Sequence, residues 1–182
     1  MLNFVKKHIS NYLISNNLKS NKRNVNNTLF NFSEIDRIGI LFNGSEKGNN
    51  IIIKETISYF SSKKISCEAL GFVNNKRMYE HNLTSLNTDF FNLNDCTFLG
   101  IPKSNNSLSF IKNKFDILIN ISNENHFLYD YIVTKSNAKL KIGHANNKYY
   151  DLTIRSDIND VGNFVKEVIF YLELINSNNE KY

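Results

Sequence analysis

Three short polar segments of this 182-residue chain each follow a run of apolar residues, and they hold the side chains that could do chemistry. Amides, hydroxyls and imidazoles can hydrogen-bond a polar ligand, and glycines let a phosphate approach the backbone closely. The segments supply eight candidate ligand-binding residues: Asn43, Gly44 and Ser45, then Asn120, Ser122 and His126, then Gly143 and His144.

Each segment also has a purely structural interpretation. Residues 43–48 contain two glycines but match neither the dinucleotide nor the P-loop glycine pattern, so these glycines could simply turn the chain before a helix. Asn and Ser between residues 120 and 126 are typical helix caps, and Glu124 suits the positive end of a helix dipole. Ligand binding and helix capping therefore both stay open.

The two histidines, His126 and His144, are expected to share one rim, where an imidazole pair could transfer protons or bind an anion. No nucleophile elbow, HExxH motif or carboxylate pair at a motif spacing accompanies them. Asp151 and Arg155 lie four positions apart along a predicted strand, which separates them by about 13 Å. We therefore assign no catalytic residue and expect a binding function. The competing hypothesis is a site for a small anionic or nucleotide-sugar-like ligand.

The elements that position these segments alternate between apolar runs of strand length and stretches of helical spacing. Strands are predicted at 37–42, 67–73, 97–100, 116–121, 140–143 and 150–155, and helices at 49–62, 108–111, 127–136 and 161–172. This order predicts an α/β fold, a Rossmann-like three-layer sandwich with a mostly parallel sheet. Residues 150–155 alternate apolar and polar side chains, so we expect one antiparallel edge strand there.

The chain divides by composition into three parts. Residues 1–33 are predicted to be a basic amphipathic helix and its linker, residues 34–176 the α/β domain, and residues 177–182 a disordered tail. The carboxyl ends of parallel strands meet at one edge of a sheet, where helix amino termini attract ligands. The three polar segments should therefore lie together at that edge.

The net charge of +5 is confined to the first 23 residues. Five basic residues occur there before the first acid, Glu34, which leaves a neutral body; they are Lys6, Lys7, Lys19, Lys22 and Arg23. They predict docking on a protein partner, or weak electrostatic contact with RNA or an anionic membrane surface. In the alternative, the apolar stripe of Leu2, Val5, Ile9, Tyr12 and Leu13 packs on the domain while the lysines are solvated.

Several classes of function find no support in the composition. No apolar run approaches the roughly 20 residues that cross a bilayer, and the amino terminus lacks the features of a secretory signal. Cys67 and Cys96 form no CxxC pair and have no clustered histidines, so we expect two buried thiols, no metal site and no cofactor. These features favour a cytoplasmic protein, and the abundance of Asn, Lys and Ile is typical of an A/T-rich bacterial genome.

The order of these signals resembles a family of small α/β proteins from Bacteroidota that has no assigned function. The resemblance rests on the segments IGILF (38–42), GF (71–72), FLGIPK (98–103), FDILIN (115–120), AKLKIG (138–143) and YYDL (149–152). It covers most of the body and implies an α/β fold of uncharacterised role.

A shorter stretch, residues 115–143, is similar to part of the amino-terminal half of heptosyltransferase-type glycosyltransferases. That likeness rests on the FDILIN and AKLKIG segments and implies a nucleotide-sugar-like ligand. Because those enzymes hold the nucleotide sugar with a second Rossmann-like domain, the resemblance implies here a half-domain that binds without reacting.

Overall fold

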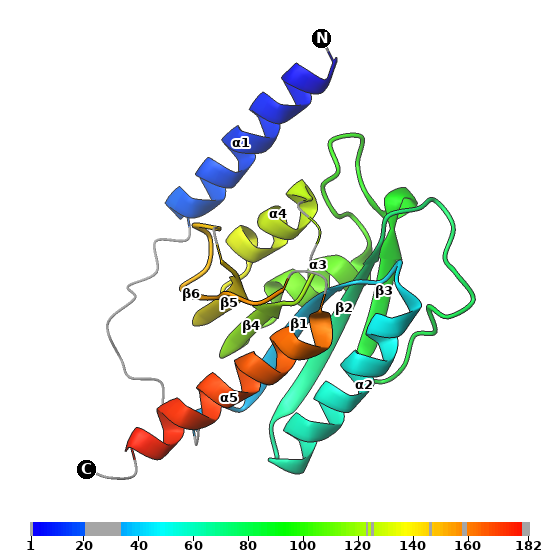
Figure 1. The fold of residues 1–182 in the computed structure, drawn as a ribbon. Helices are drawn as coiled ribbons and strands as arrows, with labels where there is room; N and C mark the ends of the chain where they lie inside the picture. Colours follow the sequence, from blue (N-terminus) through cyan, green and yellow to red (C-terminus); the bar gives the residue numbers. More distant parts are fainter. Residues whose placement is uncertain are drawn as a thin grey trace.

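The computed structural model describes residues 2–20, 34–122, 124, 126–145, 147–157 and 160–179 (Figure 1). Its elements are α1 (Leu2–Ser20), β1 (Arg37–Asn43), α2 (Lys47–Ser62), β2 (Ser66–Val73), β3 (Thr88–Asn92), the 3-10 helix η2 (Leu93–Asp95), α3 (Asn105–Lys112), β4 (Ile117–Asn120), α4 (Phe127–Lys135), β5 (Leu140–His144), β6 (Leu152–Ile154) and α5 (Val161–Asn179).

The strands form one six-stranded sheet in the order β3-β2-β1-β4-β5-β6. Every pairing is parallel, which confirms the Rossmann-like α/β fold. The expected antiparallel edge strand is wrong: β6 lies at the edge but runs parallel to β5. Alternation of apolar and polar residues indicates that one face of a strand is wet, which occurs at the edge of a parallel sheet as well as in antiparallel sheets.

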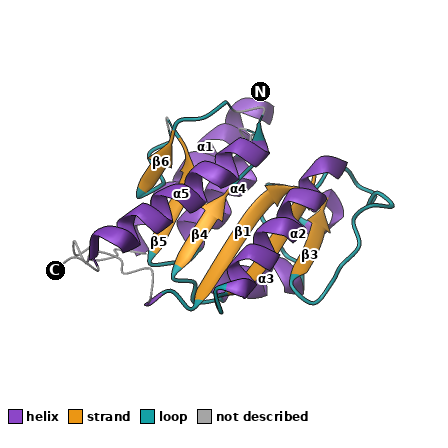
Figure 2. Cartoon of the chain, turned by 60° about the horizontal axis from the view of Figure 1, so that its bottom comes forward, coloured by secondary structure: helices purple, strands orange, loops and turns teal. Residues whose placement is uncertain are grey.

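Helices cover both faces of the sheet, and each face has its own hydrophobic core. Figure 2 shows α2 and α5 on one face and α3 and α4 on the other. Ile38, Ile40 and Phe42 of β1 pack toward α2 and α5, whereas Leu41 packs toward α3 and α4. Because both faces of β1 are buried, its sequence is a continuous apolar run instead of an alternating one.

The segment between β2 and α3 differs from the sequence prediction. Residues 97–100 were expected to be a strand, but they form a turn in which Gly100 donates its N–H to the carbonyl of Thr97. Gly100 has φ +80°, a conformation that suits glycine, and Phe98 is largely exposed. The third strand is β3, which the sequence analysis did not predict.

The amino-terminal helix packs against α4, on the side of α4 that faces away from the sheet (Figure 1). Ile14 and Asn17 are buried there, and Asn17 donates a hydrogen bond from Nδ2 to Oγ1 of Thr134 at 3.3 Å. Tyr12, which the predicted stripe included, is 70% exposed. The buried face of α1 is therefore rotated from that stripe toward Ile14 and Asn17.

Other expectations concern thiols, membrane spans and the chain ends. Cys67 and Cys96 are buried and unpaired, and burial raises the pKa of Cys67 to about 12 and that of Cys96 to about 11.

In the described ranges, no helix has the length and apolarity that a bilayer crossing requires, and no three potential metal-binding side chains group together. Helix α5 extends to Asn179, and residues 180–182 of the predicted tail lie outside the described residues.

Candidate functional site

The strand order places a topological switch point between β1 and β4. From β1 the chain first builds outward through β2 and β3, and it then returns to add β4 on the other side of β1. Sheets of this kind bind ligands in the crevice beyond the carboxyl ends of the two strands at the switch. Here those ends are Asn43 and Asn120, two of the residues that the sequence marked as candidates.

Asn43 joins the loop after β1 to the loop after β4. Its Nδ2 donates to Oε1 of Glu124 at 3.0 Å and to Oε1 of Glu46 at 3.3 Å. Its Oδ1 accepts from the backbone N–H of Ser45, and its carbonyl accepts from Nδ2 of Asn49. The two loops therefore converge as expected, but the Asn43 side chain is only 2% exposed and is held by these bonds.

Glu124 and Glu46 give this part of the site an acidic character. Burial raises the pKa of Glu124, the nearby Glu46 carboxylate raises it further, and the hydrogen bond from Asn43 opposes both. The second oxygen of Glu124, Oε2, is buried and has no hydrogen-bond partner among the described residues. A carboxylate so placed can accept a hydrogen bond from a ligand hydroxyl or ammonium group, and it disfavours a bare phosphate.

Asn120 and Ser122 shape the loop after β4. Asn120 donates from Nδ2 to the hydroxyl of Tyr150 at 2.7 Å and accepts from the N–H of Ser122 at 3.1 Å. The hydroxyl oxygen of Ser122 then accepts from the N–H of Glu124 at 3.2 Å. These turn bonds fix where the Glu124 carboxylate lies, so both side chains have a structural role at this edge.

His126 is the amino-terminal cap of α4. Its Nδ1 accepts from the N–H of Leu128 at 3.2 Å, and its ring lies 5.2 Å from the ring of Phe72. Burial lowers the pKa of His126, which favours the neutral imidazole that this cap requires. The capping interpretation of this segment is thus realised in the structure.

His144 makes its contacts on the other face of the sheet. Its ring stacks on Phe164 of α5 with 3.9 Å between centroids, and its Nε2 is buried with no partner among the described residues. Burial lowers its pKa, which a hydrogen bond to the Ile121 backbone opposes. Phe72 belongs to the core under α3 and α4, and Phe164 to the core under α5. The two imidazoles therefore do not form the pair that the sequence suggested.

The remaining candidates from the sequence, Gly44, Ser45 and Gly143, are engaged by the protein itself. The carbonyl of Gly44 accepts from Nδ2 of Asn82 at 2.7 Å, and Oγ of Ser45 accepts from the N–H of Asn74. At Gly143 an added Cβ would meet the Tyr150 ring at 2.5 Å. Gly143 is glycine because an aromatic ring lies directly against it, which is a packing reason.

Three residues contribute to the carboxyl edge of the sheet but were not predicted as site residues from the sequence: Glu46, Glu124 and Tyr150. Glu124 was considered as a polar side chain of its loop and as a helix-dipole partner, and Glu46 as part of its loop, but neither was among the candidate ligand-binding residues. The two carboxylates meet at Asn43 because β1 pairs with β4. That pairing joins residues far apart in the sequence, such as Ile38 and Ile117, which are 79 positions apart. The signal in the sequence that could have identified them is the single acidic residue, Glu46 or Glu124, among the polar residues of each loop.

The basic residues of the amino terminus are described only in part. Lys19 lies exposed in the last turn of α1. The side chains of Lys6 and Lys7, and all of Lys22 and Arg23, lie outside the described residues. Their predicted contact with an anionic surface stays a prediction.

Comparison with known proteins identifies one family. The model of a family described as "Family of unknown function (DUF6913)" matches residues 6–175. No curated protein and no solved structure matches the chain.

Proposed function

Because this chain belongs to the DUF6913 family, whose description names no activity, we propose from its geometry that it is a non-catalytic cytoplasmic binding module, which docks on an acidic partner protein through its amino-terminal helix. The observation that carries the proposal is the mounting of α1 on α4. Ile14 and Asn17 fix the helix on the domain, and its outer face is left toward solvent.

The outer face of α1 combines apolar and cationic side chains. Tyr12 and Lys19 are exposed on this face, because residues seven positions apart lie on one side of a helix, and Leu18 is exposed at the flank of the buried face. Tyr is enriched at the energetic centres of protein interfaces, and surrounding cations steer an acidic partner toward them. A rigidly mounted helix also loses little conformational entropy on docking.

A bilayer is the less favoured target of the same helix. An in-plane membrane helix inserts its apolar face, but Ile14 is buried against α4 and Ile9 and Leu13 are half-buried. The face that a membrane would need is thus turned toward the domain.

The polar carboxyl edge of the sheet supports binding without chemistry. Asn43, Asn120 and His126 are each held by hydrogen bonds that shape loops or cap a helix. A catalytic acid or base must instead lie within hydrogen-bond reach of the group that it serves. Cys67 and Cys96, two buried thiols left unpaired, are consistent with a reducing compartment.

Site-specific photo-crosslinking in the producing cells tests the proposal. A photo-reactive residue in place of Tyr12 in the full-length protein should give one discrete protein adduct. The same residue in place of Tyr171, which is exposed on α5, should not. The adduct should disappear in a variant that carries glutamine at all five basic positions of the first 23 residues, because it keeps Ile14 and Asn17 and removes the attraction.

A matched variant controls for total charge. It carries glutamine at five exposed lysines of the body, namely Lys64, Lys76, Lys112, Lys114 and Lys166, and it should keep the adduct. Loss of the adduct in both variants, or adducts with lipid or RNA alone, would contradict docking of this helix on a protein.

A second candidate function is favoured by the switch point itself. The unpartnered Oε2 of Glu124 lies where sheets of this order hold nucleotides, which supports a nucleotide-sugar-like ligand whose hydroxyl groups meet the carboxylates. UDP-glucose should then raise the melting temperature more than UDP does, and Glu124→Gln should reduce that gain. No stabilisation by UDP-glucose at millimolar concentration would exclude this ligand class.

A further inference from the structure

A pocket of about 250 Å³ lies on the face of the sheet opposite α1, between α2 and the edge strand β3. Helix α2 packs on β2, and the pocket lies beside it at the sheet edge, with Phe90 of β3 among the residues that line it. The loop between β2 and β3 supplies the outer wall. The contacts described above between α1 and α4, which involve Ile14, Asn17 and Thr134, lie apart from the residues that line this pocket.

Regular spacing brings the lining side chains together. Lys47, Asn50, Ile51 and Lys54 recur at the intervals that place residues on one face of a helix, and that face of α2 turns toward the pocket. Thr88 and Phe90 are two positions apart on β3 and so share one face of the strand.

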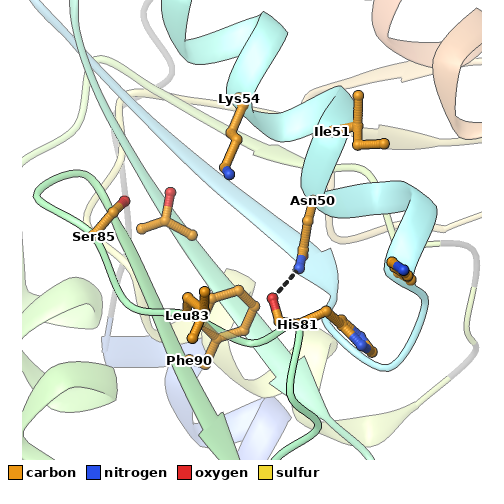
Figure 3. A pocket seen from close by; sticks show the side chains of 9 residues that line it. Asn50, Ile51, Lys54, His81, Leu83, Ser85 and Phe90 are labelled. Atoms are coloured by element: carbon orange, nitrogen blue, oxygen red, sulfur yellow. Dashed lines mark hydrogen bonds between the residues drawn. The ribbon is translucent and has the colours of Figure 1, made fainter.

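The loop wall is anchored on both sides. Asn50 donates from Nδ2 to the carbonyl of His81 at 2.6 Å, as Figure 3 shows. The His81 ring stacks on Tyr79, and its Nε2 lies 3.3 Å from the carbonyl of Gly44. The wall that carries Leu83 and Ser85 is therefore held by α2 and by the loop after β1, so the pocket is formed before any ligand arrives.

The interior combines an apolar surface with a cationic end. Phe90 supplies the apolar floor and the exposed Leu83 an apolar part of the loop wall. Lys54 extends from α2 with its ammonium group directed into the pocket, across from Ser85 (Figure 3). Among the described residues, no carboxylate forms an ion pair with Lys54 or Lys47. An unneutralised ammonium beside hydroxyl groups and an apolar floor is complementary to an amphipathic anion.

We propose that this pocket binds a small apolar carboxylate, whose carboxylate pairs with Lys54 and the hydroxyl groups of Ser85 and Thr88 and whose apolar part lies on Phe90 and Leu83. The volume of the pocket, about 250 Å³, limits the size of the ligand. Because drug-sized molecules usually occupy roughly 300–1,000 Å³, the occupant here has about ten heavy atoms. The exposed Ile51 and Leu83 at the rim lose water contact when it binds.

Three compounds of matched size test the proposal: 3-phenylpropanoate, 3-phenylpropan-1-ol and 3-phenylpropylamine. Titration of the full-length protein, followed by amide chemical shifts, should show 3-phenylpropanoate shifting residues of the pocket with a Kd on the order of 1 mM or tighter. The alcohol should bind more weakly, and the amine should not bind.

Variants separate the charge from the apolar surface. Lys54→Gln should weaken 3-phenylpropanoate about fivefold, because a partly exposed charge-assisted bond is lost, and should leave the alcohol unchanged. Lys166→Gln, an exposed lysine of α5, should change neither. Equal affinity of the acid and the alcohol, shifts outside the pocket, or an unchanged Kd in Lys54→Gln would overturn the proposal.

Discussion

The side-chain amide of Asn43 donates a 3.0 Å hydrogen bond to Glu124 across the switch point of the sheet, where β1 and β4 end side by side. The bond ties two loops whose residues are 81 positions apart. Asn43 is thus the residue through which the carboxyl edge of the sheet is held together.

Asn43→Ala should destabilise the protein by about 1–3 kcal/mol, because it leaves the buried carboxylate of Glu124 without its donor. Asn43→Asp should cost more near neutral pH, because it places a third carboxylate beside Glu46 and Glu124. Urea unfolding measures both. Asn137→Asp, at an exposed loop position, should change the unfolding free energy by less than about 0.5 kcal/mol.

Glu124 should make stability fall as pH rises above the ordinary pKa of glutamate. Burial and Glu46 raise its pKa in the folded protein, so between the ordinary and the raised value the folded state holds more protons than the unfolded chain. Glu124→Gln cannot titrate and should gain stability relative to the natural protein across that range. Urea midpoints at several pH values measure the gain, and parallel curves would refute the assignment.

His126 should contribute the opposite slope. Burial lowers its pKa, so between the lowered value and the ordinary value of about 6.5 the unfolded chain holds more protons, and stability rises with pH. His126→Asn keeps a side-chain acceptor at the cap of α4 and should lie within about 1 kcal/mol of the natural protein near neutrality. At about pH 5 it should be the more stable of the two. A variant that loses stability equally at both pH values would contradict this.

Asp116 ties the starts of β1 and β4. Its Oδ2 accepts from the N–H groups of Asp36 and Arg37 at 2.9 Å, and its Oδ1 accepts from Nζ of Lys139 at 2.7 Å. Burial alone would raise its pKa, but the bonds from Lys139 and the two amides outweigh burial and lower it.

Asp116→Ala should therefore cost about 2–3 kcal/mol near neutral pH. Because the folded pKa is depressed, this contribution is complete above the ordinary value of about 3.9 and is lost as pH falls through the depressed value. Urea unfolding at neutral and acidic pH should show the gap between variant and natural protein closing. Asp116→Asn, which keeps an acceptor oxygen, should lose less than Asp116→Ala.

The local pattern of apolar residues was sufficient to predict the strands that are buried on both faces. Ile38, Ile40 and Leu41 are almost completely buried, so β1 is a continuous apolar run that needs no knowledge of its neighbours. Strand β3 was missed because it lies at the sheet edge, where Thr88 and Asp89 are only partly buried and two Phe residues are its whole apolar signal.

The sequence could predict which loops form the candidate site, but it could not predict which side chains meet there. That Asn43 and Asn120 end neighbouring strands follows from a parallel sheet, but the meeting of Asn43 with Glu124 requires the order of the strands, which long-range pairing decides. In the same way, His126 follows β4 and His144 ends β5, the next strand along the chain, yet the sheet separates their contacts because α4 and α5 pack on opposite faces.

Gly143→Ala should separate packing from ligand binding at the third loop. Its Cβ would lie 2.5 Å from the Tyr150 ring, so the ring must move, and the overpacking should cost about 1–3 kcal/mol. Shortening the ring residue should relieve the clash, so Gly143→Ala should cost less in a Tyr150→Leu background than in the natural protein, as a double-mutant cycle would measure. Gly48→Ala is the matched control: nothing lies within 4 Å of its Cβ, and in α2 alanine should stabilise by about 0.5–1 kcal/mol. Equal costs of Gly143→Ala in both backgrounds would show that Tyr150 is not the reason for glycine at this position.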